Sequence, residues 1–251
     1  MLRLRQVKQI GRVVHFFREA ESTNDIAKSL ARKSREGTVV VAETQTRGKG
    51  GLGRNWHSPR GGLWISIILK PSLPPAQTPV LNLVVSLAVA EAISMLGIEA
   101  KTRWPNDVIV RGKKIAGILA EAEFNGRTNY VVVGCGIDTN VEIESFPEDI
   151  RQRASSLRRE LGMEIDHPGL MKQIFTSIEF YYRQLMDGYL REVLERWKAQ
   201  SDMIGRRVQI RTRNESFAGI SLDIESDGSL LVRTQDGQVQ RAFVGECTLV
   251  E

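Results

Sequence analysis

Cysteine is scarce in this 251-residue chain, which has only Cys135 and Cys247, 112 positions apart. No C-x-x-C pair occurs, so the sequence predicts neither a disulfide framework nor a zinc knuckle and favours a reducing compartment, the cytoplasm. An uninterrupted apolar run of 18 residues is also missing, and therefore no membrane span is expected. The basic N-terminal residues lack the apolar stretch and the cleavage site of a secretory signal.

Acidic residues are absent from the whole stretch between Glu43 and Glu91. The same 47 residues contain the cations Arg47, Lys49, Arg54, Arg60 and Lys70. Glycines cluster at the start of this stretch, at positions 48, 50, 51 and 53, where backbone N–H groups can approach a ligand closely. Glycines and cations without carboxylates favour an anion site, and the alternative is a basic surface loop. The net charge of +5 is too small to indicate nucleic-acid binding by itself.

The segment GKGGLG at 48–53 matches G-x-G-x-x-G, but its surroundings exclude the dinucleotide fingerprint. That fingerprint opens a helix and is followed by an acid about 20 residues later, whereas here Asn55 to Pro59 follow and no acid precedes Glu91. A P-loop is excluded as well, because Arg54-Asn55 replaces the Lys-Ser/Thr pair. Any nucleotide is therefore bound by another framework.

Three other polar segments interrupt apolar ones: RWPND at 103–107, Lys114 directly after a turn, and GCGIDTN at 134–140. Asp107 has the carboxylate that suits Mg²⁺ bound with phosphates, and Lys114 can direct its charge into a cleft. Each has a plainer alternative: an Asx turn, a solvated lysine and a strand exit. The histidines show no metal spacing, and no G-x-S-x-G elbow occurs, so neither a metal centre nor an acyl-transfer triad is predicted.

The order of elements predicts an α+β fold with one mixed sheet. Helices are expected at 24–35, 80–96 and through much of 147–200, and strands at 38–42, 63–69, 99–103, 107–110, 114–124 and 130–136. From Arg207 onward, short alternating runs are separated by Asp-Gly turns and predict a small β-barrel. We therefore expect a catalytic domain at 1–203 and a C-terminal domain at 204–251.

Taken in order, these segments resemble the biotin protein ligases. The matching blocks are STND at 22–25, AETQTRGKGGLGRNWHSP at 42–59, RWPNDVIV at 103–110, KKIAGIL at 113–119 and GCGIDTN at 134–140. The resemblance implies a catalytic fold like that of class II aminoacyl-tRNA synthetases and an SH3-like C-terminal barrel. It also implies two reactions: biotin and MgATP form biotinyl-5′-AMP, and the adenylate then acylates a lysine of a biotin carboxyl carrier domain of acetyl-CoA carboxylase or a related carboxylase.

The resemblance also assigns site residues by position. It implies biotin contacts for Ser22, Thr23, Asn24, Gln45, Lys49, Gly50, Gly51, Lys114 and Gly117. It implies ATP or adenylate contacts for Arg47, Gly48, Arg54, Trp56, Asn106, Asp138 and Asn140. Asp107 is expected to hold Mg²⁺, and Lys114, Arg54 and Lys49 are expected to be catalytic.

The chain departs from the family pattern at four positions. Lys49 and Gly51 stand where arginine is usual, Arg103 where lysine is commoner, and Asp138 where asparagine is usual. We expect Arg103 to be tolerated. Because the Gly51 position helps to cover the bound intermediate, the sequence predicts an adenylate that escapes more easily.

Two alternatives remain at this level. A lipoate–protein ligase has the same adenylation chemistry, and a non-catalytic biotin- or nucleic-acid-binding module is the rival from another class. The last 48 residues contain two Phe and no Trp or Tyr, which disfavours base stacking. Only about 21 residues precede STND, too few for a DNA-binding domain, so a monofunctional ligase without DNA binding is expected. Relatives often dimerise through the catalytic sheet, which makes a homodimer a further expectation.

Overall fold

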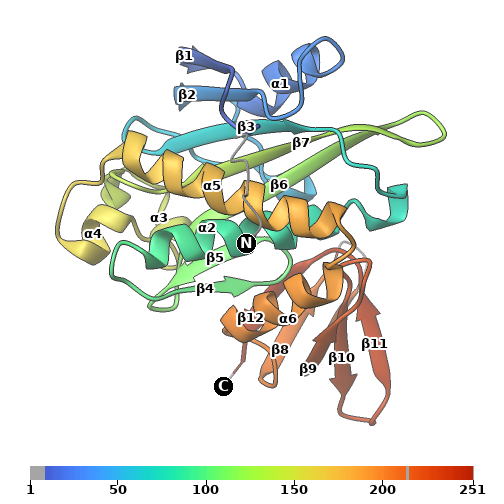
Figure 1. Ribbon diagram of the computed structural model, residues 1–251. Coiled ribbons are helices and arrows are strands. Elements are labelled where there is room, and N and C mark those ends of the chain that lie inside the picture. Colours follow the sequence, from blue (N-terminus) through green and yellow to red (C-terminus); the bar gives the residue numbers. More distant parts are fainter. Residues whose placement is uncertain (1–8, 213–214, 251) are drawn as a thin grey trace, which may run out of the picture.

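The computed structural model describes residues 9–212 and 215–250, and its centre is a seven-stranded sheet in the order β1-β2-β3-β7-β6-β5-β4 (Figure 1). Its strands are β1 (Val14–Ala20), β2 (Val39–Gln45), β3 (Leu63–Leu69), β4 (Ala100–Arg103), β5 (Asp107–Val110), β6 (Lys113–Phe124) and β7 (Thr128–Ile137). Only β1 and β2 pair in parallel, and the other neighbours are antiparallel. The expected mixed sheet is confirmed.

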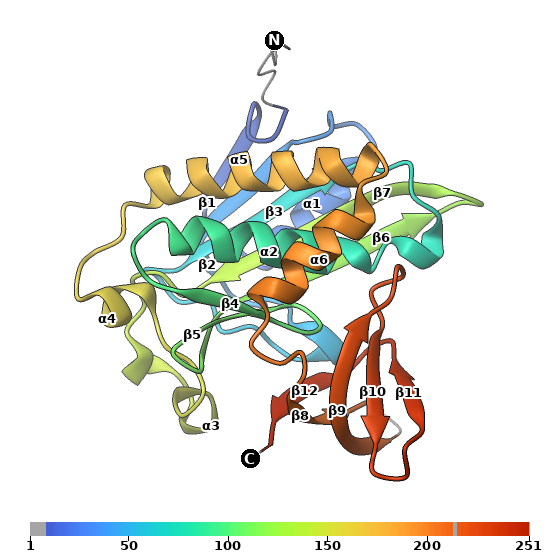
Figure 2. The ribbon, with the colours of Figure 1, turned by 60° about the horizontal axis from the view of Figure 1, so that its bottom comes forward.

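Helices cover both faces of this sheet (Figures 1 and 2). The helices of the described residues are α1 (Thr23–Ala31), α2 (Val80–Ser94), α3 (Glu148–Arg151), α4 (Leu157–Leu161), α5 (His167–Met186) and α6 (Leu190–Gln200). On β3, Ile65 and Ile67 pack in the core with α2 and α5, whereas Ile68 packs with Ala27 of α1 on the other side. Because both faces are covered, all seven residues of β3 are buried.

Helix α2 is apolar around most of its circumference, and twelve of its fifteen residues are buried. The segment Pro75–Ser94 has the length and composition of a membrane span, and no other helix of the described residues does. Of its most apolar window, 72% is buried inside the fold. Its position between the sheet and helices α5 and α6 accounts for this composition.

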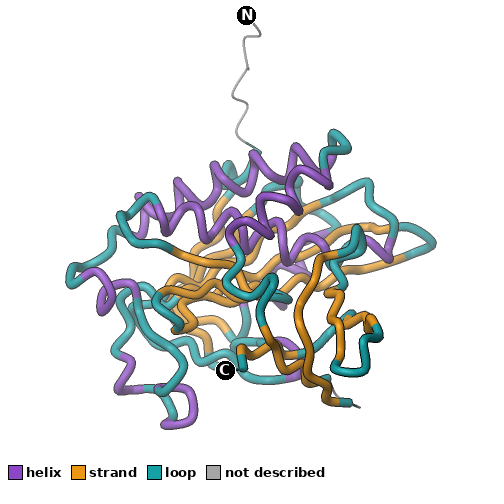
Figure 3. The backbone as a smooth tube through the Cα atoms, turned by 90° about the horizontal axis from the view of Figure 1, so that it is seen from below, coloured by secondary structure: helices purple, strands orange, loops and turns teal. Residues whose placement is uncertain are grey.

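The C-terminal residues form a separate five-stranded antiparallel sheet in the order β11-β10-β9-β8-β12 (Figure 3). The strands are β8 (Arg207–Arg211), β9 (Ser216–Ile224), β10 (Leu230–Thr234), β11 (Val239–Ala242) and β12 (Glu246–Leu249). Both Asp-Gly turns are present, with Gly228 at φ 85° and Gly237 at φ 83°, values that favour glycine. The short strands and Asp-Gly turns that the sequence predicts after Arg207 are thus found.

Several contacts fix this sheet against the catalytic part. The indole N–H of Trp104 donates to the carbonyl of Gly228 at 2.9 Å, and Arg103 forms a two-point ion pair with Asp202, in the segment that leads into β8. Met203 is fully buried in the core that includes both sheets. These contacts hold strand β12 beside the polar segment at 103–107.

Three local differences separate the predicted elements from the observed ones. Helix α1 ends at Ala31, four residues before the predicted end. The segment 147–200 is divided into four helices, with Gly162 (φ 72°) and Gly188 (φ 89°) at two of the breaks. Strand β1 was not predicted, because its sequence VHFFREA lacks a regular apolar alternation, and it forms through parallel pairing with β2.

Candidate active site

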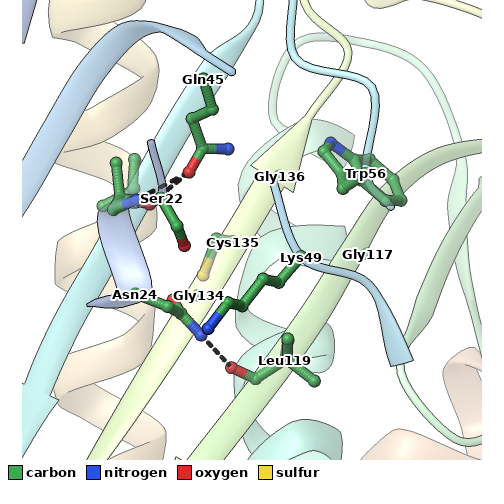
Figure 4. Close-up of a pocket in the computed structure, with 12 residues that line it drawn as sticks. Ser22, Asn24, Gln45, Lys49, Trp56, Gly117, Leu119, Gly134, Cys135 and Gly136 are labelled. Atoms are coloured by element: carbon green, nitrogen blue, oxygen red, sulfur yellow. Dashed lines mark hydrogen bonds between the residues drawn. The ribbon is translucent and has the colours of Figure 1, made fainter. Parts of the chain in front are cut away.

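A small polar cavity of about 30 Å³ lies between α1 and strands β2, β3, β6 and β7 (Figure 4). Its lining residues are Ser22, Thr23, Asn24, Gln45, Lys49, Trp56, Ile65, Gly117, Leu119, Gly134, Cys135 and Gly136. The Thr23 N–H and hydroxyl both donate to Oε1 of Gln45, at 2.8 and 3.0 Å. The small cavity is therefore walled by side chains that hold one another in place.

Asn24 is fixed from both sides of this cavity. Its Oδ1 accepts from the Ser66 hydroxyl at 2.6 Å, and its Nδ2 donates to Oε2 of Glu121 at 2.7 Å. A Cβ at Gly134 would lie 2.3 Å from Oδ1 of Asn24, so only glycine fits opposite this amide. The local packing thus explains why the β7 strand carries a glycine at this point.

A larger cavity of about 230 Å³ adjoins the small one and extends to the C-terminal sheet. Among its lining residues are Lys49, Gly50, Gly51, Arg54, Trp56, Arg103, Asn106, Asp107, Lys114, Gly117, Asp138, Arg153 and the segment 245–248. Cations outnumber carboxylates in this lining, so the cavity suits a ligand with several negative charges. Its size is below the usual range for drug-sized ligands, roughly 300–1,000 Å³, so an ATP-sized ligand needs some opening.

Trp56 separates the two cavities and lines both. Its ring lies against the paired glycines Gly117 of β6 and Gly136 of β7, where added Cβ atoms would approach it to 2.8 and 2.5 Å. Its indole N–H is buried and has no hydrogen-bond partner in the described part of the chain. A buried donor without a partner is unfavourable by about 1–3 kcal/mol. A ligand that moves the Trp56 ring so that its N–H finds a partner therefore removes this unfavourable free energy.

The cations of the glycine-rich loop are paired with carboxylates from three other segments. Arg47 pairs with Glu21, Lys49 with Asp25 at 2.5 Å, and Arg54 with Glu246 of β12 at 3.2 Å. Figure 4 shows the Lys49 side chain extending across the small cavity toward Asn24 and Leu119. All three pairs are partly exposed, and such pairs contribute only about 0–1 kcal/mol, so an anionic ligand can replace the carboxylates.

Lys114 enters the larger cavity from β6 and is held by two contacts. Its Nζ lies 2.6 Å from Oδ1 of Asp107 on the neighbouring strand β5 and 5.1 Å from the centre of the Trp56 ring. Asn106, in the turn before β5, donates from its side-chain amide to the carbonyl of Ile118. In the RWPND segment, the Asp107 carboxylate therefore pairs with Lys114, and the Asn106 amide forms a hydrogen bond to strand β6.

Asp138 follows β7 and lines the same cavity, with only 2% of the residue exposed. Burial raises the pKa of the Asp138 carboxyl well above its ordinary value, and the charge of Lys114 offsets part of this. Cys135, predicted to be a small buried residue, is buried, and burial raises its thiol pKa to about 12. Its position in the site is therefore not that of a nucleophile.

The structure brings most of the predicted site residues together. Ser22, Thr23, Asn24 and Gln45 line the small cavity; Gly50, Gly51, Arg54, Asn106, Asp107, Lys114 and Asp138 line the larger one; Lys49, Trp56 and Gly117 line both. Lys114, Gly50 and Gly51, expected at biotin, thus line the larger cavity and not the small one in this conformation.

Three predicted ATP contacts are placed outside both linings. Arg47 points to Glu21, and Asn140 uses its side chain to bond the backbone N–H and carbonyl of Ile165. Gly48 is required by packing, because a Cβ there would lie 2.4 Å from the Trp56 carbonyl oxygen. In this conformation the geometry supports a structural role for each of the three.

Sequence reasoning missed the contribution of the C-terminal sheet. Gly245, Glu246, Cys247 and Thr248 line the larger cavity, and Glu246 pairs with both Arg54 and Arg153. No sequence signal marks Glu246, since it is an ordinary acid in a short strand. Only the docking of the two sheets brings it to the loop.

Comparison with known proteins identifies the family that the sequence motifs resemble. The family described as "Biotin/lipoate A/B protein ligase family" matches residues 16–138, and "Biotin protein ligase C terminal domain" matches residues 203–249. The bifunctional ligase/repressor BirA of Bacillus spizizenii is 38% identical over 220 residues, which are 86% of this chain and 68% of that protein.

Two further similarities cover almost the whole of both proteins. The biotin–[acetyl-CoA-carboxylase] ligase of Paracoccus denitrificans is 27% identical over 87% of this chain and 93% of that protein. The biotin protein ligase of Aquifex aeolicus, solved in complex with biotin and ATP, superposes with a TM-score of 0.81 at 28% identity, over 95% of this chain and 99% of that one. On its sequence and its structure, the chain belongs to the biotin protein ligase family.

Proposed function

We propose that this chain activates biotin with MgATP to give biotinyl-5′-AMP and pyrophosphate, and then transfers the biotinyl group to a lysine of a biotin carboxyl carrier domain of acetyl-CoA carboxylase or a related carboxylase. The observation that carries the proposal is the junction of two cavities of different character at Lys49, Trp56 and Gly117. One is small and lined by amides and hydroxyls, and the other is larger and lined by cations. A carboxylic acid bound in the small cavity therefore lies next to a nucleotide bound in the larger cavity.

The small cavity suits the ureido ring of biotin, which carries two N–H donors and one carbonyl acceptor. Ser22, Thr23, Asn24 and Gln45 supply hydroxyl and amide groups of both kinds. Asn24 is already held by Ser66 and Glu121, and Gln45 by Thr23. Such fixed groups lose little freedom on binding. Because the cavity is small in this conformation, we propose that Lys49 and Trp56 move when biotin enters.

In the first reaction, a carboxylate oxygen of biotin attacks the α-phosphorus of ATP. The bond from this phosphorus to the oxygen that bridges to the β-phosphate breaks, and pyrophosphate leaves with the electron pair. Both reactants are anions, so repulsion opposes their approach. We propose that Lys49, Arg54 and Lys114 neutralise this charge and orient the two groups.

In the second reaction, the neutral amine of the acceptor lysine attacks the acyl carbon of the adenylate. The bond between this carbon and the phosphate oxygen breaks, AMP leaves, and the new amide nitrogen loses its proton. The residues that stabilise AMP as a leaving group are those that stabilise the α-phosphate in the first step. We propose this role for Lys114 and Arg54.

Magnesium enters this scheme as part of the substrate MgATP. Among the described residues, no group of three or more His, Cys, Asp or Glu side chains could hold a metal ion. Asp107, the expected ligand, faces Lys114 instead. We propose that Asp107 positions Lys114.

Biotin-dependent exchange between ATP and pyrophosphate tests the proposed function directly. We expect exchange with biotin and none with lipoate, the acid that the sister enzymes of this family use. Exchange with lipoate alone would make the chain a lipoate–protein ligase. Absence of exchange with both acids would leave a binding module without catalysis.

We also infer three finer properties of the molecule. The catalytic sheet and helices correspond to the fold of class II aminoacyl-tRNA synthetases, and the C-terminal sheet to an SH3-like barrel. A homodimer through the catalytic sheet is supported by the edge position of β1, on which Phe16 is 59% exposed. A cytoplasmic location fits the two free, buried cysteines. Analytical ultracentrifugation of the wild type and of Phe16→Glu tests the dimer.

A further inference from the structure

The wall of the larger cavity contains a carboxyl group that the steps above do not use. Asp138 is 2% exposed, and its Oδ1 is buried without a hydrogen-bond partner in the described part of the chain. The backbone of the residue, in contrast, is firmly held: its N–H donates to Ile115 and its carbonyl accepts from Leu157. The side chain is thus fixed against the cavity while its polar atom has no protein partner.

The charges around Asp138 do not supply a counter-ion for it. The cation whose charge acts on Asp138 is Lys114, and its ammonium lies 2.6 Å from the Asp107 carboxylate. Asp138 itself forms no ion pair with any residue in the described ranges 9–212 and 215–250. Lys114 is therefore paired with Asp107 and not with Asp138, and an ionised, unpaired carboxylate in a buried position is strongly unfavourable.

The charged side chains on the neighbouring elements pair with other residues and not with Asp138. Arg153, on the segment that bonds to the Lys114 backbone, pairs with Glu246. The charged residues of α4 have other partners: Arg158 pairs with Glu142, Arg159 with Glu144, and Glu160 with Arg111. His167 contacts the hydroxyl of Thr139, the residue that follows Asp138. Burial lowers the pKa of His167, which favours the neutral form of this histidine.

We propose that Asp138 binds the nucleotide as a neutral carboxylic acid, whose O–H group donates a hydrogen bond to an oxygen of the bound ATP. A neutral carboxyl group has one O–H donor, whereas a carboxylate has only acceptors and repels phosphate. Burial, which raises the Asp138 pKa, favours the same form. The inference rests on the proposed function, since it assigns a nucleotide to this cavity.

It follows that ionisation of one side chain weakens ATP binding as the pH rises. Only protein in which Asp138 is neutral binds ATP in this way. Above the pKa of Asp138, the apparent KM for ATP therefore increases by up to about tenfold per pH unit. Asp138→Asn keeps a donor of the same shape but cannot ionise. In that variant the KM for ATP stays level where that of the wild type rises.

The test is biotin-dependent ATP–pyrophosphate exchange measured between about pH 6 and pH 9, a range in which an ordinary aspartate is always ionised. The ratio of the wild-type KM for ATP to that of Asp138→Asn is expected to rise with pH, while Asp149→Asn, a change at an exposed aspartate, follows the wild type. A ratio that stays constant would overturn the inference while leaving the ligase activity intact. Absence of exchange at every pH in all three proteins would instead refute the proposed function.

Infrared difference spectroscopy gives a readout that does not depend on activity. At neutral pH the wild type minus Asp138→Asn spectrum is expected to contain the carbonyl stretch of a protonated carboxylic acid, and the wild type minus Asp149→Asn spectrum is not. If the Asp138 spectrum contains only carboxylate bands, the residue is ionised and the inference is wrong.

Discussion

The ammonium nitrogen of Lys114 lies 2.6 Å from Oδ1 of Asp107. The two residues lie on adjacent antiparallel strands, β6 and β5, so the backbone hydrogen bonds of the sheet determine their approach. The same lysine faces Trp56 at 5.1 Å, which places one charge beside the aromatic wall of both cavities. A ligand phosphate that enters the larger cavity therefore meets a cation whose position is already set.

Removal of the Lys114 charge is expected to stop adenylation. In Lys114→Ala we expect the exchange rate to fall by about 10²- to 10³-fold, as for the loss of one positioned group that stabilises developing charge. Lys113→Ala is the matched control, since the neighbouring lysine is exposed and bonds only to the carbonyl of Gln152. Equal activity of the two variants would show that Lys114 does not act on the reacting groups.

Trp56 is expected to report biotin binding by its fluorescence. The other three tryptophans, Trp64, Trp104 and Trp197, are at most 1% exposed, and only Trp56 lies at the cavities. If biotin displaces this ring from Gly117 and Gly136, the emission spectrum shifts on titration. Trp56→Phe is expected to lose the shift and to keep the emission of the buried three; a shift that persists in this variant would assign the signal elsewhere.

Gly51 allows a direct test of adenylate retention. A Cβ at this position would meet no atom within 4 Å, so an arginine fits without displacing the loop. A hydrogen bond from a charged group contributes about 1.5–3 kcal/mol, and Gly51→Arg is therefore expected to slow release of the adenylate by roughly tenfold or more. Release into solution and biotinylation of bystander lysines measure the effect.

The control for this experiment is Gly51→Ala, which adds a side chain but no charge. We expect it to release the adenylate as fast as the wild type. Equal retention in the wild type and in Gly51→Arg would contradict the prediction that the glycine makes the intermediate escape more easily.

His167 is expected to make stability depend on pH. Its ring nitrogen lies 2.6 Å from the Thr139 hydroxyl, and burial lowers its pKa from 6.5. The unfolded chain therefore binds the proton more readily, so stability is present above the unfolded value and is lost as the pH falls below about 6.5. Thermal unfolding of the wild type and of His167→Gln between about pH 5 and pH 7 checks this, with a flatter profile expected for the variant. Parallel profiles would exclude His167 as the source.

The sequence alone was sufficient for much of this architecture. The absence of acids between Glu43 and Glu91 and the glycines of the loop predicted an anion site, and the loop lines the larger cavity. Strands β6 and β7 and the Asp-Gly turns of the C-terminal sheet were predicted where they occur, since turn chemistry and strand periodicity act over a few residues. The ordered motifs also identified the family.

Tertiary structure decided which of these residues meet. Lys114 and Asp107 were separate candidates in the sequence, and the pairing of β5 with β6 made them partners. Arg47 and Asn140 were taken for ligand contacts, and their carboxylate and backbone partners lie 26 and 25 positions away. Glu246 reaches Arg54 only because Trp104 and Met203 bring the two sheets together.

The difference between what the sequence predicts and what the tertiary structure decides has a physical reason. Local propensity, turns and hydrophobic patterning are short-range properties, so a sequence by itself determines the elements and the kind of ligand that a loop attracts. Ion pairs, burial and the state of a buried acid depend on distances between segments far apart in the chain. Asp138 illustrates the difference: its sequence neighbours show an ordinary polar strand exit, and only the packed cavity, in which Lys114 pairs with Asp107 and not with Asp138, decides whether it holds a proton.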